Sequence, residues 1–426
     1  MAPKRKKKKF NLAGFLIQLL ILAFLCLLFY FLMVLRGRQA EKSAAFASET
    51  SASAAVTETA ATPEPAELAA EPTATPEPTP EPTPTPTPEP QPEYFTFSFL
   101  GDNTLWATDN FVNSEYGLPV MVGEDYAYPY KNTVQYFIDD ELTLANLECS
   151  FSDEKLAHDY TYTTFPFLAK TSFANILLEG GVDFVTMANN HALDFYQAGV
   201  DSTQATLDEY GIPYGYENEG HLITTKNGLK VGIWTAGNDL APSKTKAEEG
   251  VKELREQGAE IVICMFHWGQ ELYYEPTAAQ IEVAHAAIDA GADIVYGTHP
   301  HCLQPVETYN GKLIMYSVGN WVFGGNTMPT DADTAIIQVT IKRDVDGTVS
   351  YEGFDAIPCC ISSNLEAGNE INTSYDHNRF QSYNDYCPTP YEEGSAGYGR
   401  VLSKLDGSFV PDSQGADYSS YYASWS

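Results

Sequence analysis

Between residues 94 and 361, short apolar runs alternate with longer stretches in which apolar residues recur at helical spacing. Such runs are typical of parallel strands that are buried on both faces, and the stretches between them suit connecting helices. We expect strands at residues 94–100, 142–147, 184–188, 231–236, 261–266, 293–296 and 334–341. We expect helices at residues 132–137, 172–178, 198–210, 246–257 and 278–290. The pattern therefore predicts an α/β fold, with one folded domain over residues 94–361.

Three dipeptides mark tight turns between neighbouring apolar runs: Asn227-Gly228, Asn310-Gly311 and Asp346-Gly347. Asn-Gly and Asp-Gly favour the two-residue turns of β-hairpins, because both central positions need a positive φ. The sequence therefore predicts antiparallel hairpins beside the parallel strands.

Five polar clusters follow the apolar runs at the points where strands are expected to end. They are Gly101-Asp102, Asn146-Leu147-Glu148, Asn189-Asn190-His191, His267-Trp268-Gly269 and His299-Pro300-His301. In open α/β sheets, functional groups gather at the carboxyl ends of the strands, so we expect these five loops to converge. Carboxylates, amide oxygens and imidazoles are ligands for divalent metals. Four of the chain's eight histidines lie in the clusters, and together the clusters predict a metal site.

Each cluster also has a purely structural interpretation. Gly101-Asp102 could be a plain turn, Asn189-Asn190-His191 a helix cap, and His267-Trp268-Gly269 a buried aromatic corner. The most specific cluster is His299-Pro300-His301, since the proline fixes the backbone between two imidazoles that one loop presents. The occurrence of all five clusters in this order is stronger evidence for a metal site than any single cluster.

The N-terminal residues predict a membrane anchor. Residues 4–9 are all basic, and residues 10–35 are apolar except for Asn11, Gly14 and Gln18. A run of this length can span a bilayer, and the stronger positive flank places residues 1–9 in the cytoplasm. The alternative is a cleaved signal peptide, whose apolar core is usually only about 7–15 residues long. We expect a single-pass protein of the cell membrane, with its folded domain extracellular.

Residues 36–93 contain few large apolar side chains and end in repeated Thr-Pro-Glu-Pro units. Such a segment cannot bury enough surface to fold, so we expect a disordered linker. Its proline-rich part favours polyproline II, which extends roughly 3.1 Å per residue and would act as a spacer through a cell wall. A linker that merely tolerates low complexity is an equal alternative, and both give a domain boundary near residue 94.

The part of the chain after residue 40 holds 57 acidic and 16 basic residues, a formal charge of −41. This charge excludes nucleic acid as a partner, and an anionic substrate would need a bound cation to approach. A Cys-x-x-Cys pair is absent, so a thiolate zinc site is not expected. One disulfide is possible among Cys359, Cys360 and Cys387 in an extracellular domain.

The ordered motifs resemble those of the CapA family of capsule and poly-γ-glutamate biosynthesis proteins over residues 94–342. They include Ala145-Asn146-Leu147-Glu148, Ala188-Asn189-Asn190-His191, Gly297-Thr298-His299-Pro300-His301 and Tyr316-Ser317-Val318-Gly319-Asn320. The resemblance implies a calcineurin-like metallophosphatase fold, a four-layer α/β sandwich that holds two divalent metals (Mn, Zn or Fe). It also implies anchoring at the outer face of the membrane, in agreement with the N-terminal residues.

Residue roles follow from the same resemblance. Asp102 and His301 would bind one metal, Asn190, His267 and His299 would bind the other, and Glu148 would bridge the two. His191 would be the general acid or orient the substrate. Residues expected to support the ligands or contact the substrate are Asn146, Glu271, Gln304 and Asn320. Phe167-Leu168-Ala169-Lys170 stands where the family commonly has Phe-Arg-Ala, so an anion-binding arginine is missing and Lys170 could replace only its charge.

The sequence leaves three functions open. The first is production or export of a capsule or a poly-γ-glutamate exopolymer, with cleavage or transfer of an anionic polymer at the metals. The second is a metal-dependent phosphoesterase that acts on cell-surface nucleotides or wall phosphates. The third is a non-catalytic assembly factor for polymer synthase subunits. Residues 362–426 show no clear period, and we expect a partly irregular C-terminal extension without a site.

Overall fold

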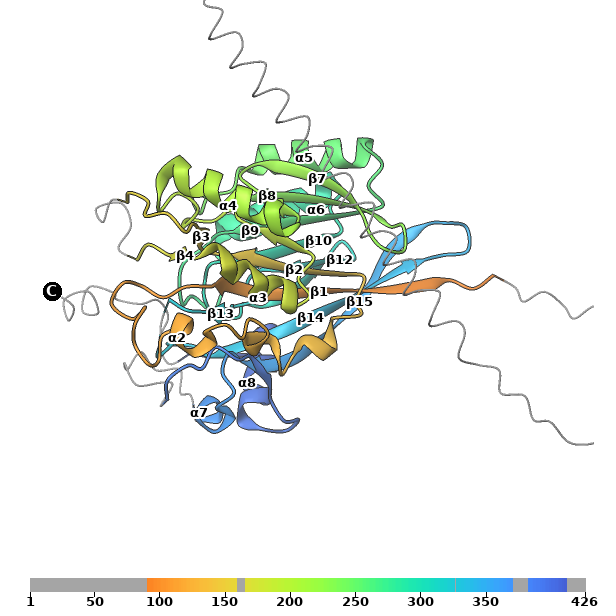
Figure 1. The fold of residues 1–426 in the computed structure, drawn as a ribbon. Coiled ribbons are helices and arrows are strands. Elements are labelled where there is room, and N and C mark those ends of the chain that lie inside the picture. The colour runs from red at the N-terminus through yellow and green to blue at the C-terminus, as the bar shows by residue number, and fades with distance from the viewer. Residues whose placement is uncertain (1–89, 159–164, 326, 371–381, 412–426) are drawn as a thin grey trace, which may run out of the picture. The chain divides into compact units, whose positions relative to one another are not determined.

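The structure, a computed structural model, describes residues 90–158, 165–325, 327–370 and 382–411 (Figure 1). The expected cytoplasmic tail, membrane helix and nearly all of the linker lie outside these residues. Within the described ranges, no helix is long and apolar enough to cross a membrane.

The larger sheet has eight strands, in the order β16-β15-β14-β1-β2-β5-β6, with β13 also paired to β1. Its strands are β1 (Glu93–Thr104), β2 (Leu142–Leu147), β5 (Phe184–Thr186), β6 (Tyr214–Gly215), β13 (Asn320–Phe323), β14 (Asp333–Arg343), β15 (Val349–Cys360) and β16 (Thr389–Pro390). β1, β2, β5 and β6 are parallel, whereas β14 and β15 add antiparallel strands on the other side of β1.

The second sheet has six strands, in the order β11-β12-β10-β9-β8-β7. Its strands are β7 (Glu219–Thr224), β8 (Lys230–Ala236), β9 (Ile261–His267), β10 (Ile294–Thr298), β11 (Val306–Tyr309) and β12 (Lys312–Met315). The central four are parallel, and hairpins add antiparallel β7 and β11 at the two edges. All three expected hairpins are present. Asn310-Gly311 forms the expected two-residue turn with a positive φ at both positions, whereas the other two loops are longer and only their glycines, Gly228 and Gly347, have a positive φ. A separate two-stranded sheet pairs β3 (Ser150–Phe151) with β4 (Leu168–Ala169).

The helices are α2 (Leu118–Val122), α3 (Asn175–Glu179), α4 (Tyr196–Tyr210), α5 (Lys244–Glu256), α6 (Ala278–Ala290), α7 (Leu365–Asn369) and α8 (Ala396–Leu405). Side chains fix the starts of the longer ones. Ser243 accepts a hydrogen bond from the backbone of α5, and Thr277 and Gln280 form a capping box at the start of α6.

Buried side chains arrange these elements in four layers. One core lies between the sheets and takes Phe97 and Leu144 from the larger sheet and Ile263 from the smaller. A second core packs α3 and α4 on the outer face of the larger sheet, and a third packs α5 and α6 on the smaller. The central strands β2 and β9 are thus covered on both faces, which explains why they are continuous apolar runs, whereas the edge strand β7 alternates between half-buried and exposed residues. The α-β-β-α order of layers agrees with the expected four-layer sandwich.

Two expected helices are different in the structure. Residues 132–137 form only a short 3₁₀ turn at Val134–Tyr136, because the adjacent β-branched Thr133 and Val134 disfavour an α-helix. The helix at residues 172–178 begins as a 3₁₀ turn, Thr171–Ala174, and only α3 is α-helical. Neither change moves the neighbouring strand, so the positions of the polar clusters are unaffected.

The described part of residues 362–426 is integrated into the domain. In α8, Val401 and Leu405 lie in the core between the sheets, together with Tyr391. Helix α8 packs on β14 and β15 (blue in Figure 1). The disulfide that the sequence allows is not formed, because Cys359, Cys360 and Cys387 are free, buried thiols.

Candidate metal centre

The register of the parallel strands brings the polar clusters together. Asp102 on β1 lies opposite Asn146 on β2 and opposite Asn320 on β13. In the other sheet, His267 at the end of β9 lies opposite Thr298 at the end of β10. The two sheets meet at this edge, where the backbone N–H of His299 donates to Asp102 Oδ2 at 3.4 Å. The convergence that the sequence predicts is therefore present.

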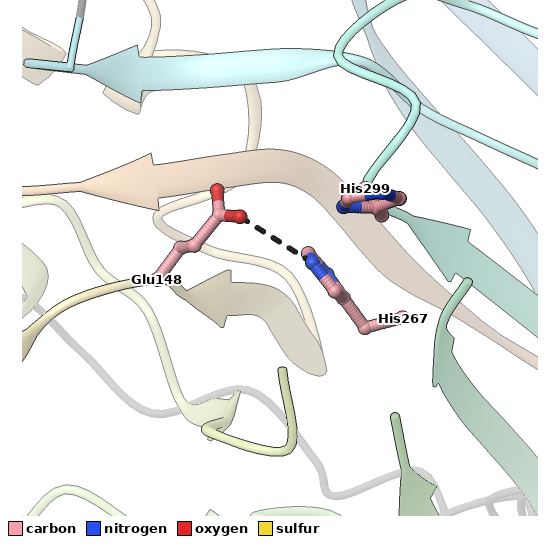
Figure 2. A group of neighbouring side chains, drawn as sticks. All are labelled: Glu148, His267 and His299. Atoms are coloured by element: carbon pink, nitrogen blue, oxygen red, sulfur yellow. Dashed lines mark ion pairs between the residues drawn. The ribbon is translucent and has the colours of Figure 1, made fainter. Parts of the chain in front are cut away.

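Glu148 lies at the middle of the cluster. Its Oε1 is 3.3 Å from His267 Nε2 and 3.8 Å from His301 Nε2, and its side chain is fully buried. Figure 2 shows the carboxylate facing His267, with the His299 ring beside them. Thr104 donates a hydrogen bond from Oγ1 to Glu148 Oε2 at 3.3 Å, which fixes the orientation of the carboxylate.

Three overlapping groups of donors could hold a metal ion. In each group, one ligand atom from every residue lies within 4.8 Å of the others. The groups are Glu148 with His267 and His299, Asp102 with Glu148 and His301, and Glu271 with His299 and His301. Asn190 adjoins the first group, since its Oδ1 is 2.7 Å from His267 Nε2. All six residues that we expected to be metal ligands are thus in one place.

One buried atom supports a metal at this position. Among the described residues, His299 Nδ1 has no hydrogen-bond partner. Buried polar atoms are almost always hydrogen-bonded, so each such exception needs a physical reason. A mixed set of carboxylates and imidazoles suits Zn²⁺, Mn²⁺ or Fe²⁺. The residues present therefore fit a divalent ion.

The pKa values of the side chains in the cluster depend on one another. Burial alone would raise the pKa of Glu148, but His301 and His267 outweigh it and hold that pKa well below its ordinary value. Burial alone would lower the pKa of His301, yet Glu148 and Asp102 raise it to about 10. Burial, with His267 and His301 nearby, lowers the pKa of His299 well below its ordinary value. A metal ion that binds His301 must replace its proton.

The loop that carries two of the histidines has an unusual backbone. His299 has φ 97° and His301 has φ 52°, both in the left-handed region that residues other than glycine rarely adopt. Gly297 precedes them, and a Cβ there would lie 2.1 Å from the carbonyl oxygen of Tyr316. Strain of this kind persists where surrounding structure enforces it, often at functional sites. The loop is thus shaped to present both imidazoles to the cluster.

Hydrogen bonds from neighbouring strands orient the ligands. Asn320 Oδ1 lies 2.8 Å from His301 Nδ1, and Asn146 donates to Asp102 Oδ1 at 2.7 Å, as expected for supporting residues. Thr298 Oγ1 lies 2.8 Å from His267 Nδ1, a contact that the sequence analysis did not identify. A sequence signal for this contact is the position of Thr298 between Gly297 and His299. The orientation of the Thr298 side chain, however, follows only from the pairing of β9 with β10.

Gln304 does not have the expected contact with an imidazole. Its Nε2 donates to the backbone oxygens of Tyr273 and Glu275, and its Oε1 accepts from Gln280. The reason is that its side chain points toward the loop after β9 and the start of α6. Gln304 therefore supports the loop that carries Glu271.

His191 lies at the rim of the cluster with its side chain 14% exposed. Its Nδ1 is 2.9 Å from Asp194 Oδ2. Burial would lower the pKa of His191, but the hydrogen bond and charge of Asp194 raise it above its ordinary value. Asn189 fixes the segment, because its Nδ2 donates to the Leu147 oxygen and its Oδ1 accepts from the His191 backbone.

Two aromatic rings flank the cluster, and the sequence analysis did not identify them as part of the site. The Phe167 ring centroid is 4.9 Å from that of His191, and the Phe323 centroid is 4.8 Å from that of His301. The rings meet at Gly325, where a Cβ would lie 2.8 Å from Phe323 and 3.0 Å from Phe167. Lys170, expected as a replacement for the missing arginine, is exposed at the end of β4.

Two known proteins are similar in sequence to part of this chain. The chain is 32% identical over 198 residues to the PGA biosynthesis protein CapA of Bacillus subtilis (strain 168), which is 42% of this chain and 51% of that protein. It is 26% identical over 283 residues to the capsule biosynthesis protein CapA of Bacillus anthracis, 60% of this chain and 66% of that protein. The matched region thus spans about half of the first relative and just under two thirds of the second.

A solved structure with a distant likeness is the NAD nucleotidase of Haemophilus influenzae. It has 12% sequence identity, covers 79% of this chain and 67% of its own, and gives a TM-score of 0.36, which says nothing about function. The family model described as "Bacterial capsule synthesis protein PGA_cap" matches residues 96–325, more than half of the chain. That range contains every residue of the metal cluster. The chain belongs to the bacterial capsule synthesis protein family PGA_cap.

Proposed function

We propose that this chain makes or exports an anionic exopolymer, such as a poly-γ-glutamate capsule, with a two-metal site of hydrolase or transferase type. The convergence of Asp102, Glu148, His267, His299 and His301 on one point is the observation that carries the proposal. Family membership and the names of the two Bacillus relatives support the class of polymer.

The ligand roles that we propose divide the cluster between two ions. Asp102 and His301 hold one, Asn190, His267 and His299 hold the other, and Glu148 lies between them. We propose Mn, Zn or Fe ions. Divalent ions in such a site supply Lewis-acid polarisation of a substrate oxygen and activation of water.

His191 is the proposed general acid. Asp194 accepts from its Nδ1, so the proton that can move to a leaving group is the one on Nε2. The raised pKa favours the protonated ring, which general acid catalysis requires. Phe167 packs against the ring and limits the access of water.

The proposed location is the outer face of the cell membrane, anchored by residues 10–35 and held off the bilayer by the linker. The formal charge of −41 after residue 40 repels a polyanion, so the metal ions would provide the positive charge that draws the polymer to the site. Polymer synthase subunits in the membrane are the proposed partners.

Metal analysis of the purified full-length chain tests the metal part of the proposal. We expect up to two divalent ions per chain, and loss of metal in a His299→Ala, His301→Ala double variant. A His221→Ala, His285→Ala double variant is the matched control, because both histidines lie on β7 and α6, outside the clusters. Fewer than about one ion in the unmutated chain would contradict a two-metal site.

Substrate screening then separates the three functions. Cleavage of γ-glutamyl peptides, lost in His191→Ala at unchanged metal content, is the expected result. Cleavage of aryl phosphates or phosphodiesters alone would favour the surface phosphoesterase. Defective polymer release in cells, with no cleavage of any of these compounds, would favour the non-catalytic assembly factor.

A further inference from the structure

Glu271 lies on the loop after β9, four residues beyond the ligand His267. The sequence assigns it only a supporting role. In the structure, one of its carboxylate oxygens lies within 4.8 Å of ligand atoms of both His299 and His301. Its side chain is only half-buried, whereas His299 is almost completely buried, so Glu271 approaches the cluster from the solvent side.

Backbone hydrogen bonds hold the loop of Glu271 against the loop of the two histidines. The N–H of Trp268 donates to the Thr298 oxygen at 3.1 Å, and the N–H of Leu272 donates to the Pro300 oxygen at 2.7 Å. Gln304 adds a bond from its Nε2 to the Tyr273 oxygen at 2.8 Å. These bonds lie on both sides of Glu271 in the sequence, so the position of its backbone is fixed relative to His299 and His301.

Backbone strain is concentrated at the same place. Leu272 has φ 58°, beside His299 at 97° and His301 at 52°. Left-handed residues other than glycine are strained and persist only where the surrounding structure enforces them. These three residues lie next to one set of donor atoms. Their strain indicates that the surrounding structure holds both loops in these positions.

An independent observation points to a ligand here. His299 is 4% exposed, and its Nδ1 has no hydrogen-bond partner among the described residues. A ring nitrogen in that condition is available to a metal ion. The carboxylate of Glu271 has an oxygen within 4.8 Å of a ring nitrogen of His299, close enough for one ion to bind both side chains.

We propose that Glu271 is a direct metal ligand, which joins His267 and His299 on the ion assigned to them and so completes a set of two imidazoles and one carboxylate, while His301 stays with the ion at Asp102. The inference rests on the metal centre of the proposed function and adds to it a carboxylate that the expected ligand set lacks. Such sets bind Fe²⁺ and related divalent ions, and an added carboxylate favours harder ions such as Mn²⁺. Because Glu271 faces solvent, it completes the coordination on the side from which a substrate enters.

The test is a chelator-competition titration of the full-length chain with Mn²⁺. We expect Glu271→Gln, which keeps the shape and removes the charge, to weaken the binding of one ion at least 10-fold and to leave the other ion bound. Glu275→Gln is the matched control, since Glu275 is exposed on the same loop and belongs to none of the donor groups. It should bind Mn²⁺ as the unmutated chain does.

Unchanged affinity and stoichiometry in Glu271→Gln, with two ions bound, would overturn the inference and leave the proposed function standing. Absence of metal from the unmutated chain would overturn both. Glu271→Cys provides a second readout that misfolding cannot imitate, because a thiolate ligand should raise the preference for Cd²⁺ over Mn²⁺. A Cd²⁺/Mn²⁺ preference equal to that of the unmutated chain would contradict direct ligation.

Discussion

The side chains that orient the candidate ligands come mostly from strands other than those of the ligands. Asn320 at the start of β13 contacts His301 in the loop after β10, and Asn146 on β2 contacts Asp102 on β1. A ligand's ring orientation and tautomer depend on such partners, so their loss weakens metal binding without removing a ligand.

Asn320→Ala should lower the affinity for divalent metal by about 10- to 100-fold, because His301 loses the acceptor at its Nδ1. Competition with a fluorescent chelator measures the change. Asn113→Ala, at an exposed position, is the control and should have no effect. Equal affinities for the two variants would show that the Asn320 contact is incidental.

Gly297→Ala should destabilise the domain by about 1–3 kcal/mol or more, since the new methyl group meets the Tyr316 carbonyl oxygen at 2.1 Å. Urea unfolding measures the free energy. Gly353→Ala is the matched control, because a Cβ there meets nothing within 4 Å. Equal stability of the two variants would contradict the close approach of Gly297 to residue 316.

The types of residue at the site could be predicted from the sequence, but several of their partners could not. Asp102, Glu148 and His299 each follow an apolar run, and that position predicts a strand end. Phe323 and Thr298 also lie at strand ends, but whether they touch a ligand depends on contacts across strands. Periodicity along one strand contains no information about such contacts.

At the scale of elements, α8 is joined to β14 by a buried ionic cluster. Lys404 donates to Asp331 at 2.6 Å and to Asp333 at 2.7 Å, and Arg400 donates to both oxygens of Asp333. The side chains of Lys404 and Asp333 are fully buried. Asp333 also adjoins the loop before β13, since its carbonyl oxygen lies close to Gly319. The cluster therefore connects the C-terminal residues to the strand that supports the metal site.

Lys404→Met should destabilise the domain by about 3–5 kcal/mol, because it leaves buried carboxylates without their cation. Chemical denaturation followed by circular dichroism is the measurement. Lys252→Met, at an exposed position of α5, makes the same chemical change and should cost less than about 1 kcal/mol. A similar, small loss in both variants would contradict the contribution of the cluster.

The pH dependence of this stabilisation follows from the pKa shifts. Burial would raise the pKa of Asp333, but Lys404 and Arg400 hold it below its ordinary value. Burial would lower the pKa of Lys404, but Asp331 and Asp333 raise it. The carboxylate's contribution is therefore full above its unfolded pKa of about 3.9 and is lost as the pH falls through the folded value. The ammonium's contribution is full below about 10.4 and is lost as the pH rises through its folded value.

The stability difference between the unmutated chain and Lys404→Met should consequently be constant from about pH 5 to 9 and shrink in more acidic solution. Urea unfolding across this pH range measures it. A difference that grows as the pH falls below about 4 would contradict the assigned charges.

The residues of α8 contain a helix signal, but the composition of the surrounding sequence makes that signal hard to recognise. Ser395 caps the helix, and Val401 and Leu405 lie one turn apart on its buried face. Tyr, Gly and Ser dominate the surrounding residues, so no longer period was visible. The strands of residues 94–341 were predictable because burial on both faces leaves uninterrupted apolar runs.

At the scale of the whole domain, four layers bring the carboxyl ends of two sheets to one edge. Three hydrophobic cores hold the layers together. The metal cluster contains residues from both sheets, so it can form only when the two sheets have packed together. Among the described residues, His299 Nδ1 in this cluster has no hydrogen-bond partner, and a bound ion would satisfy it. Metal binding should therefore stabilise the complete fold.

Addition of Mn²⁺ at about 1,000 times its dissociation constant should stabilise the folded chain by about 4 kcal/mol per site and raise its melting midpoint. Differential scanning calorimetry of chelator-treated protein, with and without Mn²⁺, measures the effect. The His299→Ala, His301→Ala variant should show little or no increase. An equal increase in that variant would indicate that the metal acts elsewhere.

The two-metal site is tested by anomalous diffraction from crystals grown with Mn²⁺. We expect two peaks near Glu148, one beside Asp102 and His301 and the other beside Asn190, His267 and His299. Fully occupied Mn²⁺ at other positions, with no peak among these six side chains, would contradict the metal centre and the function built on it.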